Sequence, residues 1–230
     1  MMPSRTGSDR TVPRVALALV AVVVTCVILA ACSISGDSRP RALAVSTTTT
    51  QVEAAPTSGE ATAVLYFVRD GKLIPVTRSL PDRRVGTVLG ALLGTPEPVE
   101  RIKGLGSSIP AGTDLLGLQT DGDTLSVDLS DDFENVVGPA RQQAIAQMVL
   151  TATEYPQIRS MRFLVNGKPF QVTSPTQGDT TTVTDCDYMS LLPTAEDVKD
   201  ADLDEATAQR LAARRDELAQ RCPTPTTARS

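Results

Sequence analysis

Six carboxylates lie close together between residues 121 and 134, and they are the first candidates for chemistry. They are Asp121, Asp123, Asp128, Asp131, Asp132 and Glu134. A carboxylate pair can act as acid and base in hydrolysis, and a larger set can bind calcium. The spacing lacks the EF-hand pattern, and Asp is favoured in turns because it bonds to nearby backbone. We therefore expect turn residues here, and we keep a hydrolase that uses carboxylates near Asp121–Glu134 as the alternative function.

The sequence contains no histidine. Triads of the Ser-His-Asp kind, His-ligated metals and imidazole acid–base catalysis all need that residue. Ser107, Ser108 and Ser130 have no evident basic partner that would activate a nucleophile. We find no catalytic constellation, and we expect a non-enzyme with neither cofactor nor bound metal.

The net charge of the chain is −5, from 22 basic and 27 acidic residues. Residues 1–31 hold three arginines and one aspartate, so the remainder has 19 basic and 26 acidic residues, or −7. An acidic surface disfavours binding to nucleic acid. We expect no nucleic-acid partner.

The first 32 residues combine a basic segment, an apolar run and a cysteine. The run from Val15 to Ala31 is apolar nearly throughout, and its length is at the short edge of a membrane span. It ends in Leu29-Ala30-Ala31-Cys32, which closely resembles a bacterial lipoprotein signal peptide. The resemblance implies removal of residues 1–31 and attachment of lipid such as palmitate to Cys32, on the outer face of the cytoplasmic membrane. A retained anchor helix with an incidental cysteine is the alternative.

Residues 32–60 have the composition of a tether. They include Pro40, the four threonines Thr47–Thr50 and Pro56, and they show no hydrophobic period. Such a segment cannot bury enough surface to offset its ordering entropy. We predict a disordered tether between the lipid and the folded domain.

Three turn signals organise the residues that follow: Asp70-Gly71, Asp121-Gly122 and Asn166-Gly167. Each lies between apolar or alternating runs, and these dipeptides suit two-residue hairpins in which both central residues take positive φ. Pro75 cannot donate to a strand ladder, so the strand Lys72–Arg78 should lie at a sheet edge.

Two apolar patterns of helical period lie between the hairpins. Asp82 is a suitable N-cap for the first helix, in which Gly86 and Gly90 suggest close approach to the sheet. The second helix begins at Pro139 and should turn Gln147 outward. Pro98 to Ser108 is predicted to be an irregular link. The element order predicts an α+β fold, with helices packed on one face of a mixed sheet built from hairpins.

Several of these segments together resemble the GerMN domain. They are LYFVRDGKLIPVTR, VLGALLGTP, IPAGTDLLGL, LSVDLSDDF and FLVNGKP, and the resemblance covers residues 61–173 once. The domain takes its name from a spore-germination protein and is common in actinobacterial lipoproteins. It is not known for catalysis, and it is similar to ring-building domains of trans-envelope machines. The resemblance implies a non-catalytic binding or scaffolding module, whose partner is an envelope protein or a cell-wall component.

Residues 174–222 extend beyond that domain and contain the last two cysteines. Cys26 leaves with the signal peptide, so Cys186 and Cys222 remain as an even pair on the oxidising side of a membrane. Such a pair is expected to form a disulfide. Thr194 can cap a helix that runs to Arg221, and its narrow apolar stripe predicts a surface helix. Residues 223–230 should be disordered.

Two strands are candidate contact surfaces for a partner. One is the edge strand Lys72–Arg78, although its proline and terminal charges are also usual protection against unwanted pairing. The other is the return strand Lys168–Val172, where Phe170 is a candidate partner contact on a rigid hairpin. Phe170 would alternatively close the core, and both interpretations stay open.

Overall fold

The structure is a computed structural model that describes residues 60–222. Four predicted features lie outside the described residues: the signal peptide (1–31), the lipid-bearing Cys32, the tether up to residue 59 and the tail (223–230). None of the helices between residues 60 and 222 has both the length and the apolar composition needed to cross a membrane.

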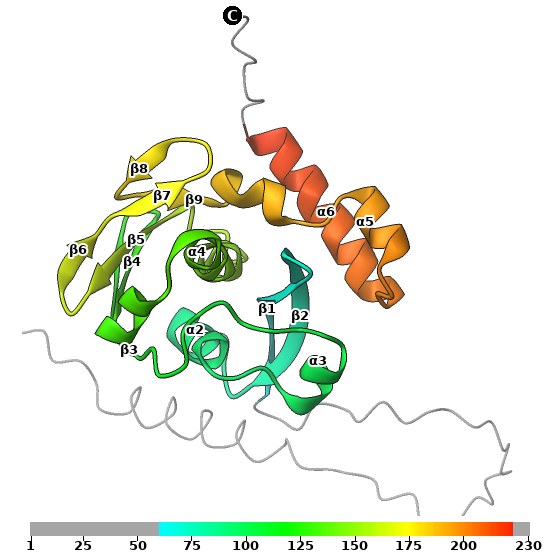
Figure 1. Ribbon diagram of the computed structural model, residues 1–230, viewed down its shortest axis with the longest axis horizontal. Helices are drawn as coiled ribbons and strands as arrows, with labels where there is room; N and C mark the ends of the chain where they lie inside the picture. The colour runs from blue at the N-terminus through cyan, green and yellow to red at the C-terminus, as the bar shows by residue number, and fades with distance from the viewer. Residues whose placement is uncertain (1–59, 223–230) are drawn as a thin grey trace, which may run out of the picture. The chain divides into compact units, whose positions relative to one another are not determined.

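The described strands form three sheets (Figure 1). The central sheet has the order β3-β4-β5-β6, with β9 pairing to β5, and it is mixed because β4 and β5 are parallel while the other pairs are antiparallel. Its strands are β3 (Leu115–Asp121), β4 (Thr124–Leu129), β5 (Ser160–Val165), β6 (Lys168–Phe170) and β9 (Val183–Thr184). Two antiparallel pairs stand apart from it: β1 (Ala61–Arg69) with β2 (Lys72–Leu80), and β7 (Val172–Ser174) with β8 (Gly178–Thr180).

Five α-helices and two 3-10 helices accompany the strands in the described range. They are α2 (Val85–Leu93), α3 (Pro98–Ile102), α4 (Gly138–Ala152), α5 (Ala195–Asp200), α6 (Glu205–Arg221), η1 (Asp131–Asn135) and η2 (Asp185–Leu191). The predicted α+β class, with helices packed on a mixed sheet and a C-terminal helix, is confirmed. The first hairpin, however, does not join the mixed sheet.

Helix α4 lies between the first hairpin and the mixed sheet (Figure 1) and packs against β1, α2 and η2. Every residue from Ala144 to Ala152 is buried, so this helix has no wet face over two turns. The prediction that Gln147 points outward is wrong. Its side chain is fully buried, where Nε2 donates to the Tyr66 carbonyl at 3.0 Å and Oε1 accepts from the Ser108 amide at 2.8 Å.

Two of the three predicted turns have the expected residues at their centre. Asp70 and Gly71 have φ of 51° and 76°, and Asn166 and Gly167 have φ of 48° and 74°. The middle turn is shifted by one residue, because Asp121 pairs with Thr124 and leaves Gly122 and Asp123 at the centre. Of these two, only Gly122 takes positive φ, at 61°, as in the turn type that needs glycine at its first central position.

Several predicted element boundaries are wrong for local reasons. Arg84, not Asp82, is the N-cap of α2, and Asp82 Oδ1 instead accepts from the Arg84 amide at 2.8 Å. The single helix expected from Thr194 to Arg221 is two helices, because Asp204 caps a second start by accepting from the Thr207 amide at 2.9 Å.

The supposed irregular link after Pro98 contains α3, which begins with a capping box and a proline in its first turn. The return strand predicted for Lys168–Val172 is interrupted after Phe170, because Val172 pairs with Thr180 in the separate β7–β8 hairpin.

Candidate functional site

A groove of about 760 Å³ lies between β2, α3 and the start of α6, and we call it the β2–α3–α6 groove. Its floor is the stretch of β2 from Ile74 to Ser79. One wall is α3, which presents Val99 with 55% of its surface exposed. The other wall is the chain from Asp202 to Arg210. Figure 1 shows these elements at the right of the view, with β2 between β1 and α6.

The hydrogen bonds of β1 show which backbone groups of β2 bond to β1 and which point away from it. Hydrogen-bonded and non-bonded residue pairs alternate along an antiparallel ladder. Tyr66 directs its backbone away from β2, since its amide donates to Thr151 Oγ1 at 3.1 Å and its carbonyl accepts from Gln147. Val68 does the same, exchanging two backbone hydrogen bonds of 2.8 Å with Gly106. The residues opposite Tyr66 and Val68 on β2 therefore also point their backbone groups outward.

The outward-pointing residues of β2 follow from this alternation. Pro75 is opposite Tyr66 and points its backbone carbonyl outward. Thr77 and Ser79 lie two and four residues further along β2, so their backbone groups have the same orientation. β2 pairs only with β1 among the described strands, so it is an edge strand, as Pro75 predicted. Within residues 60–222, the outward-pointing amides and carbonyls of Thr77 and Ser79 form no hydrogen bond with another backbone group. The groove therefore has a free strand edge as its floor.

A buried ion pair holds α3 against this strand. Arg78 and Glu100 have side chains that are 9% and 5% exposed, and Arg78 Nε donates to Glu100 Oε1 at 2.8 Å. The guanidinium also donates to the Ala91 carbonyl at 3.1 Å and lies 4.8 Å from the centre of the Phe67 ring. Glu100 accepts from the Glu97 amide at 2.6 Å, which completes the start of α3. One arginine thus connects β2, α2 and α3.

The groove lining carries four basic and four acidic side chains. Arg69, Lys103 and Arg210 line it, and within the described chain their side chains make neither ion pair nor hydrogen bond. The acidic lining residues Glu97 and Glu100 contact Arg78, and Asp204 is engaged as the α6 cap. Asp202 is the one lining carboxylate in residues 60–222 without such a contact. The ion pairs within the lining are therefore those of Arg78 with Glu97 and Glu100, and the charges of the lining residues sum to zero.

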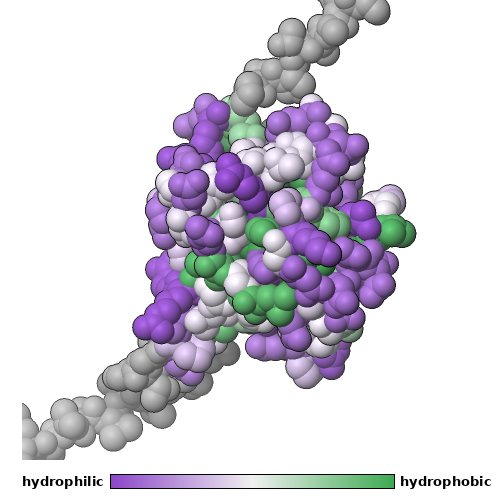
Figure 2. Space-filling model, turned by 90° about the vertical axis from the view of Figure 1, so that its left-hand side faces the viewer, coloured by the Kyte–Doolittle hydropathy of each residue, from purple (hydrophilic) through white to green (hydrophobic). Residues whose placement is uncertain are grey.

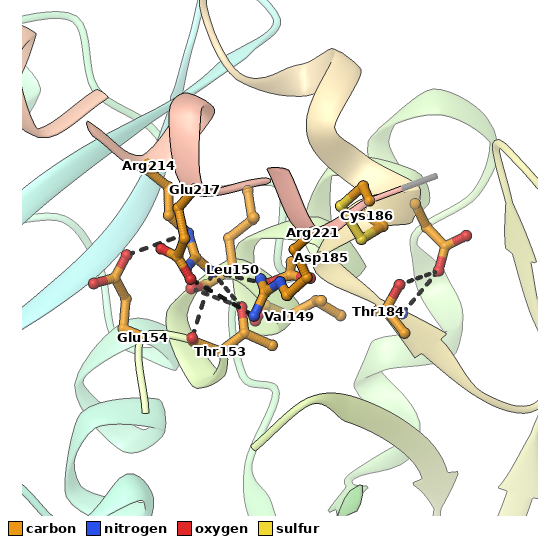
Figure 3. Close-up of polar contacts among 12 residues, drawn as sticks. Val149, Leu150, Thr153, Glu154, Thr184, Asp185, Cys186, Arg214, Glu217 and Arg221 are labelled. Carbon is orange, nitrogen blue, oxygen red and sulfur yellow. Dashed lines mark hydrogen bonds and ion pairs between the residues drawn. A yellow bond between two sulfur atoms is a disulfide. The ribbon is translucent and has the colours of Figure 1, made fainter. Parts of the chain in front are cut away.

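A second polar cluster fixes α6 behind the groove (Figure 3). Arg214, 6% exposed, donates through Nη2 to Asp185 Oδ2 at 2.9 Å and to Thr153 Oγ1 at 2.8 Å. Arg221 contacts the same Asp185 carboxylate, and Arg214 also contacts Glu217 at 2.8 Å. These contacts connect α6 to α4 and η2, so they position one wall of the groove.

Cys186 and Cys222 form the predicted disulfide next to this cluster, with their Cα atoms 5.5 Å apart. Cys186 follows Asp185 and Cys222 follows Arg221, so the covalent link and the ion pair hold the same two segments together. The far end of the cluster reaches the first hairpin, because Tyr66 Oη donates to Glu154 Oε1 at 2.7 Å. Burial, and then the Glu154 charge, raise the pKa of Tyr66 well above its ordinary value, so the phenol stays a donor.

The carboxylates between residues 121 and 134 do not converge. Asp121 and Asp123 are exposed at the hairpin end, and Asp128 Oδ1 accepts from the Gly167 amide at 2.9 Å. In the described part of the chain, the one group of three close potential metal ligands is Asp185 with Cys186 and Cys222. The two sulfurs of that group are bonded to each other.

Phe170 is half-buried and packs on the core. Its ring meets Phe133 edge to face with centroids 5.7 Å apart, and the Arg141 guanidinium lies 5.3 Å from its centre. Figure 2 shows the side of the domain where β3 and β6 lie, on which hydrophobic residues form separate patches among hydrophilic ones. Phe170 therefore makes a core contact and is also partly exposed. Both roles considered for it, core residue and partner contact, stay open.

Sequence reasoning missed the groove itself. It identified the edge strand from Pro75, but it gave no role to Glu100 and treated α3 as irregular. The available signal was Glu97-Pro98-Val99-Glu100, because acidic residues three apart with proline between them are typical of a capped helix start.

Residues 64–171 match the family model Germane, described as sporulation and spore germination. Among solved structures, the tandem GerMN domains of the sporulation protein GerM from Bacillus subtilis match with a TM-score of 0.46 and 20% identity, covering 56% of this chain and 47% of that chain. The chain thus spans about half the length of that structure.

The first GerMN domain of the same protein matches with a TM-score of 0.43 and 22% identity, covering 54% of this chain and 95% of that one. A candidate lipoprotein from Clostridium perfringens matches with a TM-score of 0.33 and 18% identity, covering 55% and 88%. No curated protein matches the chain. The similarity to the sporulation and spore germination family is thus confined to residues 64–171, which are 108 of the 230 residues of the chain.

Proposed function

We propose that the protein is an extracytoplasmic lipoprotein whose GerMN domain binds a partner in the cell envelope without catalysis. The observation that carries the proposal is the β2–α3–α6 groove. It combines a free strand edge with charged side chains of both signs, and its walls are fixed by buried ion pairs and a disulfide. Rigid walls around unused hydrogen-bonding groups favour binding, because little ordering entropy is lost when a partner arrives.

Attachment to the membrane through Cys32 is part of the proposal. Two acyl chains give stable anchoring, whereas one chain gives only marginal binding. Growth with an alkyne fatty acid should label the wild-type protein and the Cys26→Ala variant, but not Cys32→Ala. Equal labelling of all three would contradict lipidation at Cys32. The actinobacterial type of the lipoprotein stays a prediction.

The binding function is tested in intact cells with a photoreactive amino acid. Val99 is placed in the groove wall and is 55% exposed, and Leu116 on β3 is a matched control at 52%. We expect a defined adduct from position 99 and none from position 116. Absence of any adduct at position 99 would contradict a binding role for the groove.

The non-catalytic part of the proposal has its own control. The double substitution Asp131→Asn and Asp132→Asn should leave the adduct at position 99 unchanged, because these carboxylates lie in η1 and outside the groove lining. A hydrolytic activity that this pair abolishes, at unchanged melting temperature, would instead favour the envelope hydrolase.

A further inference from the structure

We propose that Asn166 is a site of spontaneous deamidation, and that the Asp128 carboxylate slows this reaction while the domain is folded. The reaction converts the side-chain amide of asparagine to an acid without an enzyme, and water is its only co-reactant. Asn166 lies in the turn of the β5–β6 hairpin, at the left of the domain in Figure 1 and away from the β2–α3–α6 groove.

The residue after an asparagine decides how readily the reaction starts. Its backbone amide nitrogen is the nucleophile, and a glycine has no side chain to obstruct the attack. The chain has two asparagines, of which Asn166 precedes Gly167. Asn135 precedes Val136, whose branched side chain crowds its own amide. Asn166 and Gly167 are both exposed, so water and hydroxide reach the turn.

The reaction begins at the Gly167 amide. Hydroxide takes the amide proton, and the nitrogen attacks Cγ of Asn166. A new bond joins this nitrogen to Cγ, the bond from Cγ to Nδ2 breaks, and ammonia leaves with a proton from water, which regenerates hydroxide. The cyclic imide then adds one water at either of its two carbonyls. The products are aspartate or isoaspartate.

The fold occupies this nucleophile. The Gly167 amide donates to Asp128 Oδ1 at 2.9 Å, so its proton is held by a carboxylate. A hydrogen bond to a charged acceptor is stronger than one between neutral groups. Removing the proton would also place a negative nitrogen within hydrogen-bond distance of a negative oxygen. Asp128 therefore opposes the first step both by its hydrogen bond and by its charge.

A second hydrogen bond holds the turn beside β4. The Asn166 amide donates to the Leu129 carbonyl at 2.9 Å, so two consecutive amides of the turn bond to two consecutive residues of β4. Attack on Cγ needs the Gly167 nitrogen deprotonated and turned toward the Asn166 side chain, which is incompatible with its bond to Asp128. The protection therefore depends on the folded pair of β4 and β5, which brings Asp128 to the turn.

The first hairpin shows what each product does to such a turn. Asp70 and Gly71 have φ of 51° and 76°, close to the 48° and 74° of the β5–β6 turn, so an aspartate fits this conformation. Isoaspartate instead adds a methylene to the backbone of a two-residue turn. The adjoining pair of Val165 with Lys168 then cannot keep its register. Deamidation to isoaspartate thus loosens the hairpin that carries Phe170.

The test uses the full chain, purified in detergent micelles and kept at mildly alkaline pH. Liquid chromatography with mass spectrometry of its peptides separates asparagine, aspartate and isoaspartate at each position. We expect Asp128→Ala to deamidate at Asn166 at least about ten-fold faster than the wild type, because the amide loses a hydrogen bond to a charged acceptor. Ser126→Ala, two residues away on the same face of β4, should keep the wild-type rate. An unchanged rate in Asp128→Ala would overturn the proposal.

Two measurements separate protection by Asp128 from a general loosening of the fold. In guanidinium chloride the hydrogen bonds of the turn are lost, so the wild type and Asp128→Ala should deamidate at the same rate. In the folded proteins, Asn135 is the internal reference and should stay an asparagine in both. A difference that persists in the denaturant, or an equal acceleration at Asn135, would overturn the role of Asp128.

The first hairpin provides a matched comparison within the same molecule. Its turn has similar φ angles, but no side chain among residues 60–222 accepts from the Gly71 amide. Asp70→Asn gives this turn the same dipeptide without a protecting carboxylate. In the folded protein, position 70 of this variant should deamidate about ten-fold faster than Asn166, or more. Equal rates at the two turns would show that the turn conformation alone sets the rate, and would overturn the assignment to Asp128.

Discussion

Arg214 and Asp185 meet in a buried ion pair across a separation of 29 residues, with Nη2 donating to Oδ2 at 2.9 Å. Both side chains are almost fully buried, at 6% and 3% exposure. Asp185 also receives Arg221, so one carboxylate holds two turns of α6 against η2. The C-terminal extension is thereby fixed to the domain by its charges as well as by its cysteines.

Asp185→Asn should lower the free energy of unfolding by about 3–5 kcal/mol, because it leaves two arginines facing a neutral group in a buried site. Urea denaturation with the disulfide intact measures this change. Glu217→Gln is the matched control, since Glu217 contacts the same arginine but is 53% exposed, and it should cost less than about 1 kcal/mol. Equal costs for the two variants would contradict the buried role of Asp185.

The disulfide should stabilise α6 independently of that ion pair. Cys186→Ser with Cys222→Ser opens a loop of 36 residues, and the chain-entropy model gives a loss of roughly 3–4 kcal/mol. Mass spectrometry of unreduced tryptic peptides from envelope protein should show the two cysteines crosslinked. Finding both as free thiols would leave α6 held by ionic contacts alone.

Acid should loosen the β7–β8 region through Asp187. Burial alone would raise the pKa of Asp187, but hydrogen bonds from Gln177, Thr176, the Thr184 amide and Ser174 outweigh it and lower the pKa below 3.8. Because the folded pKa is depressed, the stabilisation is complete above the ordinary pKa and is lost as pH falls through the folded one.

Wild-type stability should therefore fall between about pH 6 and about pH 3 by more than that of Asp187→Asn, which has no such carboxylate to protonate. Asp123→Asn, at an exposed turn, should keep the wild-type slope. Chemical denaturation at the two pH values measures the difference. A slope in Asp187→Asn equal to that of the wild type would contradict this role.

The turns and helices of the fold could be predicted because their signals are local. Glycine and asparagine mark the hairpins, and apolar period marks α2 and α4. Gly86 was expected to allow close approach to the sheet, and a Cβ there would lie 3.2 Å from Leu118 Cδ1. The same expectation was wrong for Gly90, where no atom lies within 4 Å. A glycine in the sequence shows that a small residue is tolerated at that position. Whether another element packs closely against it depends on the tertiary structure.

The groove could not be predicted because its parts meet only in the folded chain. Arg78 and Glu100 each look like solvated surface residues in their own segments, and their pairing depends on how α3 returns to β2. Gln147 lies outside the apolar stripe of its helix, so the sequence gives no sign that it is buried. In the fold it bonds to both Tyr66 and Ser108. A polar side chain of this kind can be buried only where it finds hydrogen-bond partners, and these partners lie far away in the sequence.

The Arg78–Glu100 pair should stabilise the domain and shape the groove. Glu100→Leu should cost about 3–5 kcal/mol, because it leaves a buried guanidinium with one carbonyl acceptor and a 3.7 Å contact to the exposed Glu97 carboxylate. The double variant Arg78→Met with Glu100→Leu should recover part of this loss, since neither charge is then stranded. A double-mutant cycle in urea measures the coupling. Arg84→Met, at a pair whose arginine is 86% exposed, is the control and should change stability little.

Phe170→Ala separates the two roles left open for this residue. The ring packs edge to face on Phe133 but is only half-buried, so we expect a loss of about 2–3 kcal/mol, below the roughly 3–5 kcal/mol of a fully buried aromatic. Phe170→Leu keeps most of the apolar volume and should cost about half as much. The adduct formed from position 99 should persist in both variants, because Phe170 does not line the groove. A Phe170→Ala protein that keeps full stability and loses a cellular partner would make this aromatic a contact residue, and would place a second binding surface on the β5–β6 hairpin.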